Sequence, residues 1–153
     1  LRGKGASRTS MAGLLVKVVI DTSVYIPFIN KGTSHPLLGL GQGVPLFYMS
    51  AVVIEELYAG ASDDASIKLL DNLYKTFDSA GRLIVPDASD WQKTGRIVAE
   101  LGSKYGFEDI FLARITNDIL IALSARKIGA VVVTHNTKDF LKIKEFVDFM
   151  IHE

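Results

Sequence analysis

The chain of 153 residues contains no cysteine. Disulfide bonds, thiolate metal sites and cysteine nucleophiles are therefore excluded, and the absence fits a reducing cytoplasm, where we expect the protein to be located. The sequence also lacks a run of the ~18 apolar residues that a membrane-spanning helix needs. We therefore expect no membrane partner.

Neither sign of charge is in excess, because 17 lysine and arginine residues balance 17 aspartate and glutamate residues. Any attraction to nucleic acid must then come from a local basic patch. Hydrophobic residues make up 48% of the chain, enough at this length for one domain with its own core. Residues 1–13 are small and basic without an acid, so we expect a leader or expression remnant there and a single domain over 14–153.

Short β-branched runs alternate with amphipathic segments along the chain. The predicted strands are Val16–Asp21, Pro45–Met49, Leu83–Val85, Ala130–Thr134 and Phe146–Ile151. The predicted helices are Thr22–Asn30, His35–Leu40, Ala51–Ala59, Asp64–Ser79, Ala88–Tyr105, Leu112–Ile128 and a short one within Asn136–Glu145, and Phe107–Phe111 is either a connection or a helical start. Uninterrupted apolar strands indicate that both faces of the sheet are covered. The pattern predicts the α/β class, a three-layer sandwich with a mostly parallel central sheet of four to five strands flanked by helices.

Acidic residues follow or face the predicted strand ends. Asp21 ends the first strand, and Asp139 lies just beyond the fourth. The carboxyl ends of parallel strands meet at one edge of a sheet, where binding sites gather. Asp118 begins an apolar helix and shares a face with small residues that must turn toward the sheet. Glu55 and Glu56 lie beside buried positions of another helix, and periodicity alone does not choose between them.

Four carboxylates in one pocket cannot all remain charged and unpaired. Oxygen ligands favour Mg²⁺ or Mn²⁺ over zinc, and such a cation on a few carboxylates is suited to phosphodiester hydrolysis. Neighbouring polar side chains are expected to hold the carboxylates in place by hydrogen bonds. These are Thr22, Ser23, Thr134 and Asn136.

Each of these residues also has an ordinary structural interpretation. Asp21 taken alone is typical of a helix N-cap, and Asp118 of a partner for a helix dipole. Arg114, one turn before Asp118, and Lys138, beside Asp139, are candidates for binding a phosphodiester backbone or else solvated surface charges. The combination of acids, rather than any one of them, indicates a site.

Four segments in order resemble the motifs of PIN-domain ribonucleases, most of all those of VapC-type toxins from VapBC toxin–antitoxin pairs. They are Val19–Ser23, Ser50–Gly60, Asn117–Ala122 and Thr134–Phe140, within a resemblance that covers Val16 to Ile151. In the second motif a Glu-Leu pair precedes a glycine, which selects Glu56 over Glu55. In the fourth, members differ over which residue supplies the last acid. Here only Asp139 is charged, and Asn136 is interpreted as its neutral partner.

The resemblance implies a Mg²⁺- or Mn²⁺-dependent endoribonuclease whose catalytic and metal-binding residues are Asp21, Glu56, Asp118 and Asp139. It also implies single-stranded or looped RNA as substrate, a homodimer, and a protein antitoxin that inserts a segment into the cleft. The dimer surface is either the Ala61–Phe77 region or the helix that carries Trp91. Two alternatives stay open, a catalytically silent module that binds RNA or protein and a structure-specific DNA nuclease.

Overall fold

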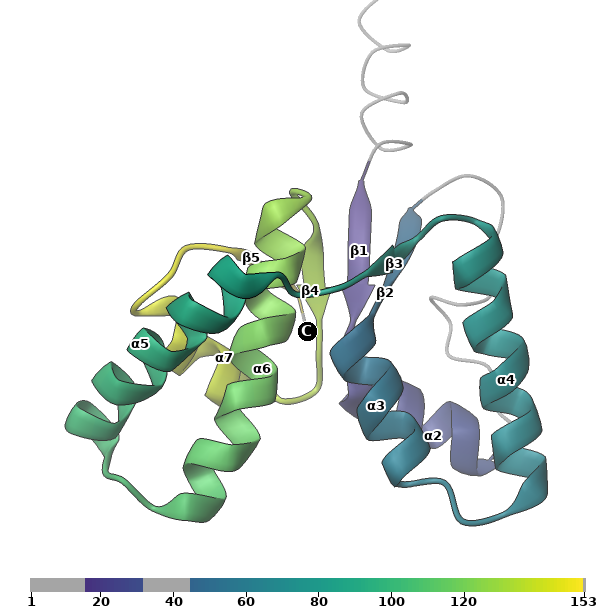
Figure 1. The fold of residues 1–153 in the computed structure, drawn as a ribbon, viewed down its shortest axis with the longest axis horizontal. Helices are drawn as coiled ribbons and strands as arrows, with labels where there is room; N and C mark the ends of the chain where they lie inside the picture. Colours follow the sequence, from purple (N-terminus) through teal and green to yellow (C-terminus); the bar gives the residue numbers. More distant parts are fainter. Residues whose placement is uncertain (1–15, 32–44, 153) are drawn as a thin grey trace, which may run out of the picture.

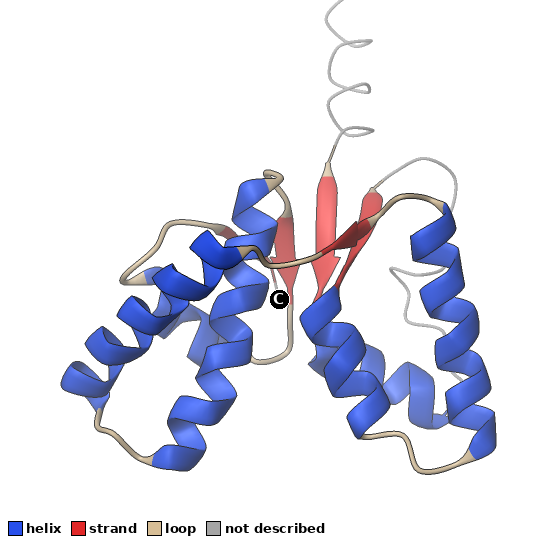
Figure 2. Cartoon of the chain, viewed as in Figure 1, coloured by secondary structure: helices blue, strands red, loops and turns tan. Residues whose placement is uncertain are grey.

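The computed structural model describes residues 16–31 and 45–152. The expected leader and the predicted short helix His35–Leu40 lie outside these residues. Within them the strands are β1 (Lys17–Ile20), β2 (Leu46–Ser50), β3 (Leu83–Ile84), β4 (Val131–Val133) and β5 (Met150–His152). The helices are α2 (Thr22–Lys31), α3 (Ala51–Ala59), α4 (Asp64–Ser79), α5 (Ala88–Tyr105), α6 (Asp109–Lys127) and α7 (Thr137–Lys144) (Figure 2).

The strands form one sheet in the order β3-β2-β1-β4-β5, and every pairing is parallel. The central strand β1 sets the register, because its Val19 lies opposite Tyr48 of β2 and Val132 of β4. The β1 residues Val18, Val19 and Ile20 are buried, as an apolar run without alternation predicts. The predicted α/β class with a parallel central sheet is confirmed.

The carboxyl edge of the sheet lies between a front and a back layer of helices. In Figure 1, α2, α3 and α7 begin at the lower, carboxyl ends of β1, β2 and β4. α3 and α6 lie toward the viewer there, with α2 and α7 behind them. Of these helices α6 is enclosed most deeply, since every residue from Asp118 to Ala125 is buried. An aspartate in that stretch is withdrawn from water by the fold itself.

Local signals explain where two helices near this edge begin. Ser50, the last residue of β2, caps α3 because its hydroxyl accepts a hydrogen bond from the amide of Val52 at 3.2 Å. Asp87 and Asp90 exchange hydrogen bonds as a capping box at the start of α5. Gly106, with φ of 107°, ends α5 in a conformation that other residues rarely adopt. Among the described helices none is long and apolar enough to cross a membrane.

The predicted last strand Phe146–Ile151 is wrong at its start, because β5 begins at Met150. The amides of Glu145 and Phe146 donate to carbonyl oxygens in the last turn of α7 instead of pairing with β4. Lys144 Nζ also donates to the carbonyl oxygen of Phe149 at 2.5 Å. These bonds close the end of α7 and leave only the final residues free for the sheet. For Phe107–Phe111, predicted as either a connection or a helical start, the structure shows a helical start, because α6 begins at Asp109.

Candidate active site

Four acidic side chains from different elements meet at the carboxyl edge of the sheet. Asp21 follows β1, Glu56 lies on α3, Asp118 on α6 and Asp139 on α7. The three aspartates are buried, with 4%, 6% and 5% of their surface exposed, and Glu56 is half-buried. The charges of Asp21, Glu56 and Asp139 all raise the pKa of Asp118, so the four carboxylates interact electrostatically. The structure thus brings together the acids that the sequence singled out.

Two hydroxyl groups hold the Asp21 carboxylate. Ser23 Oγ and Thr134 Oγ1 both donate to Asp21 Oδ2, each at 2.8 Å. The hydroxyls are themselves fixed, because the amide of Asn136 donates to Thr134 Oγ1 at 2.8 Å and that of His135 to Ser23 Oγ at 3.0 Å. The loop after β4 therefore orients an acid that follows β1.

The side-chain amide of Asn136 joins two of the acids. Its Nδ2 donates to Asp118 Oδ2 and to Asp139 Oδ2, each at 3.2 Å. Asn136 precedes α7, but its side chain makes no capping bond there, which leaves it for the site. Arg114 Nε lies 3.1 Å from Asp139 Oδ2 and supplies a positive charge at the same carboxylate. In this geometry Asp139 is an acidic member of the cluster and Asn136 its neutral neighbour.

Glu56, and not Glu55, faces the cluster. Thr22 Oγ1 donates to Glu56 Oε1 at 2.7 Å, and Asn117 Nδ2 donates to Glu56 Oε2 at 3.3 Å. Glu55 is exposed on another face of α3. Asn117 was not assigned a role from the sequence, although it directly precedes Asp118. Two adjacent helical residues can both reach the site here because α3 and α7 flank α6 on different sides.

Burial and mutual repulsion make the cluster costly to ionise. Burial is the main cause that raises the pKa of Asp118 from 3.8 to about 8, and the charges of Asp21, Glu56 and Asp139 add to it, whereas Arg114 opposes the shift. Burial also raises the pKa of Glu56, against the hydrogen bonds from Thr22 and Asn117. A divalent cation would favour the ionised forms and offset this cost.

The chemistry of the donors fits a hard cation. Carboxylate and amide oxygens are the ligands that Mg²⁺ and Mn²⁺ prefer, and no thiolate is available in the chain. Among the described residues, however, no group of three or more Asp, Glu or His side chains is arranged closely enough to hold a metal ion together. The carboxylates are instead held by hydroxyl, amide and guanidinium partners, and Asp118 and Asp139 share the amide of Asn136. The structure therefore shows a carboxylate cluster, and metal binding is a proposal.

The two predicted cations occupy different positions. Arg114 contacts Asp139 and lines a hollow of about 260 Å³, while 57% of its side chain stays exposed. Lys138 is exposed on α7 and forms no ion pair within the part of the chain that the structure describes. Lys142, one turn after Lys138, lines the same hollow as Arg114. It was not singled out from the sequence, where its only signal is helical spacing from Asp139.

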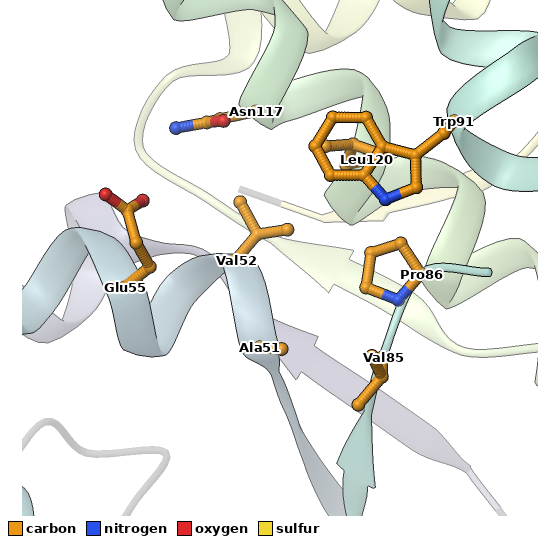
Figure 3. A pocket seen from close by; sticks show the side chains of 8 residues that line it. All are labelled: Ala51, Val52, Glu55, Val85, Pro86, Trp91, Asn117 and Leu120. Carbon is orange, nitrogen blue, oxygen red and sulfur yellow. The ribbon is translucent and has the colours of Figure 1, made fainter. Parts of the chain in front are cut away.

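A second hollow of about 500 Å³ is lined by Glu55 and Asn117, the chain neighbours of Glu56 and Asp118. Figure 3 shows Glu55 and Asn117 at one end, and Trp91, Pro86 and Val85 at the other. Trp91 and Val85 are 56% and 67% exposed. The hollow and the carboxylates are neighbours, because α3 and α6 each contribute adjacent residues to both.

Comparison with protein families matches residues 18–145 to the PIN domain family. No curated protein matches the chain. Three of the similar solved structures are VapBC2 from Rickettsia felis bound to a DNA fragment from their promoter, DNA-bound VapBC from Salmonella typhimurium, and VapBC-5 from Mycobacterium tuberculosis, a member of the VapBC family of toxin–antitoxin systems.

The likeness to these structures extends over almost the whole domain. The R. felis and S. typhimurium chains are 22% and 24% identical, with TM-scores of 0.64 and 0.62, and in both cases 90% of this chain and 98% of the other are covered. The M. tuberculosis chain is 20% identical with a TM-score of 0.56, covering 89% of this chain and 97% of its own. At this level of identity the likeness establishes a shared fold.

Proposed function

This chain belongs to the PIN domain family, and from that premise we propose that it is a divalent-metal-dependent endoribonuclease and the toxin of a VapBC-type toxin–antitoxin pair. The observation that carries the proposal is the meeting of Asp21, Glu56, Asp118 and Asp139 at one edge of the sheet. Buried acids that repel one another cost free energy, and function is a common reason to keep them.

In the proposed reaction these four carboxylates would hold Mg²⁺ or Mn²⁺, and the ion would supply Lewis-acid chemistry at the phosphoryl group and the attacking water. The chain positions the reacting groups around that chemistry. Thr134 and Ser23 keep Asp21 in one orientation. Glu56, whose pKa is raised by burial, would accept a proton from the attacking water. Arg114 balances part of the negative charge at Asp139.

A cleavage assay separates this function from its alternatives. The purified chain is incubated with an unstructured RNA, with single-stranded DNA of the same sequence and with a branched DNA, in Mg²⁺, in Mn²⁺ and in EDTA. We expect cleavage of the RNA alone, in both metals and not in EDTA. RNA binding without cleavage would indicate a catalytically silent module. Cleavage confined to branched or single-stranded DNA would indicate a DNA nuclease.

The neighbouring glutamates of α3 form a matched pair for mutation. Glu56→Gln is expected to lower the rate of RNA cleavage by about a hundredfold, because the neutral amide cannot take up a proton from water. Glu55→Gln removes the same charge one residue away, on an exposed side chain without a bond to the cluster, and should retain full activity. Rates under single-turnover conditions measure both. Equal losses in the two variants would indicate an electrostatic effect without a specific role for Glu56.

A hollow beside the site offers a suitable contact surface for the proposed antitoxin. A hollow of about 220 Å³ between α2 and α3 is lined by Ile26, Ile29, Leu57 and Gly60, together with Glu56. Ile26 is 45% exposed, although it is apolar. An apolar antitoxin segment seated there would reach the carboxylates through Glu56 and so block the site. Such a pair would act in the cytoplasm, where RNA is available.

The proposed homodimer is expected to use the surface around Trp91. Large exposed apolar side chains, here Trp91 with Val85, are typical of interface centres. Trp91→Glu should weaken dimerisation at least about tenfold, because it places a charge in that centre. Tyr74→Glu, in the alternative Ala61–Phe77 region, should leave the dimer intact. Sedimentation velocity over a range of protein concentrations measures both variants, and the reverse result would assign the interface to α4.

A further inference from the structure

A small basic hollow lies beside the carboxylate cluster, between the start of α6 and the body of α7. Its volume is about 260 Å³, and it is lined by Tyr105, Gly106, Glu108, Phe111, Arg114 and Lys142. Two of its charged side chains are cations and one is an acid. The hollow therefore differs from the adjacent cluster, where acids predominate.

The hollow begins where the cluster ends. Arg114 belongs to both, because its Nε lies 3.1 Å from Asp139 Oδ2. On α6 it precedes Asp118 by four residues, or about 6 Å along the helix axis. On α7, Lys142 follows Asp139 by three residues and so lies on the same side of that helix. A polymer strand bound at the carboxylates would therefore extend into this hollow.

The Lys142 ammonium group lies against two aromatic rings, and, after the hydrogen bond from Lys104, its charge also helps to lower the pKa of Glu145. Its Nζ lies 4.8 Å from the centre of the Tyr105 ring and 5.1 Å from that of Phe111, within the range of cation–π contacts. Among the described residues it forms no ion pair, whereas Lys104 close by is paired with Glu145. Arg114 is paired with Asp139 through Nε, but 57% of its side chain stays exposed. Both cations remain able to bind an anion.

We propose that this hollow binds the phosphodiester group next to the scissile one in the RNA strand, with Arg114 and Lys142 as its binding residues. This inference rests on the proposed function. An RNA backbone is favoured over an acidic peptide because phosphates follow one another along the strand, and Arg114 connects the hollow to the proposed cleavage site. The acid Glu108 leaves one net positive charge among the lining residues, which suits a single phosphodiester. A forked guanidinium and a compact ammonium are both common phosphate ligands.

The test measures binding of a labelled single-stranded RNA to the full chain in EDTA, so that cleavage does not interfere. Lys142→Gln should weaken binding by about three- to tenfold and make the slope of log affinity against log salt shallower by about 0.7, the value for one phosphate contact. Lys142→Arg should retain binding. Lys93→Gln removes an exposed lysine from α5, where it lines a different hollow, and should change nothing. Glu108→Gln should strengthen binding about twofold, because a repulsive charge is lost.

Glu108 makes no side-chain capping bond, so its variant should fold normally. In Mg²⁺, Lys142→Gln should raise KM more than it lowers kcat. Binding by Lys142→Gln equal to that of Lys93→Gln, in a protein that cleaves RNA, would overturn this inference alone. A wild type that neither binds nor cleaves RNA would overturn the proposed function with it. If Lys142→Gln lost affinity for an oligo-glutamate peptide but not for RNA, the hollow would belong to an acidic protein partner.

Discussion

Replacement of Asp118 by Asn is expected to lower the rate of RNA cleavage by about a thousandfold or more, while the chain still folds. A bound metal contributes several kcal/mol of transition-state stabilisation, and each 1.4 kcal/mol is about tenfold in rate. The neutral amide is a far weaker metal ligand than the carboxylate it replaces. It keeps an oxygen that can accept the hydrogen bond from Asn136 Nδ2. The loss should therefore be chemical rather than structural.

Single-turnover rates at saturating Mg²⁺ measure this prediction, with a melting curve for each variant. The matched control is Asp78→Asn, which removes an exposed carboxylate from α4, away from the cluster. The control should cleave RNA at the wild-type rate. Full activity in the Asp118 variant would exclude the residue from the mechanism.

The position of the site could be predicted because it depends on the order of apolar and polar segments along the sequence. Apolar runs predicted the strands, and a parallel sheet brings the residues after β1 and β4 to one edge. Asp21 and Thr134, far apart in the sequence, are joined there by a hydrogen bond of 2.8 Å. The choice of Glu56 over Glu55 needed the resemblance to known motifs, since helical periodicity did not separate them.

Side-chain partners could not be predicted in the same way. Asn117 donates to Glu56 because of the rotation of α6 between its neighbours, which depends on packing with α3. Lys142 reaches the rings of Tyr105 and Phe111 only because α7 packs beside the junction of α5 and α6. The apolar run from Phe146 onward predicted a longer strand, and backbone bonds that close α7 overrode it. Such contacts come from tertiary structure rather than from local pattern.

The metal-free protein is expected to lose stability as pH rises, because of Asp118. Its pKa is about 8 in the folded chain and 3.8 in the absence of burial and neighbours. Between these values the folded state holds a proton that the unfolded state has released, so the free energy of unfolding falls by about 1.4 kcal/mol per pH unit. This contribution is fully present below pH 3.8 and is lost once the pH exceeds about 8.

Asp118→Asn removes this titration and is the matched reference. Between pH 5 and pH 7 in EDTA, the wild type should lose about 3 kcal/mol relative to the variant. For a chain of this size that difference corresponds to about 6–12 °C in Tm. Thermal melts at the two pH values measure it directly. Because both proteins share every other titrating group, changes elsewhere largely cancel in the comparison.

The pKa of Glu56 is also raised in the folded chain. The pH dependence of wild-type stability alone would therefore combine the titrations of Glu56 and Asp118. The difference between wild type and variant isolates Asp118 and its coupling to the cluster. Mg²⁺ added at pH 7 should raise the Tm of the wild type more than that of the variant, since the ion binds the ionised carboxylate. A Tm difference that is the same at pH 5 and pH 7 would mean that Asp118 is already ionised in the metal-free chain. The repulsion inferred among the four carboxylates would then be offset without a proton, for example by Arg114, and the nuclease proposal would lose this support.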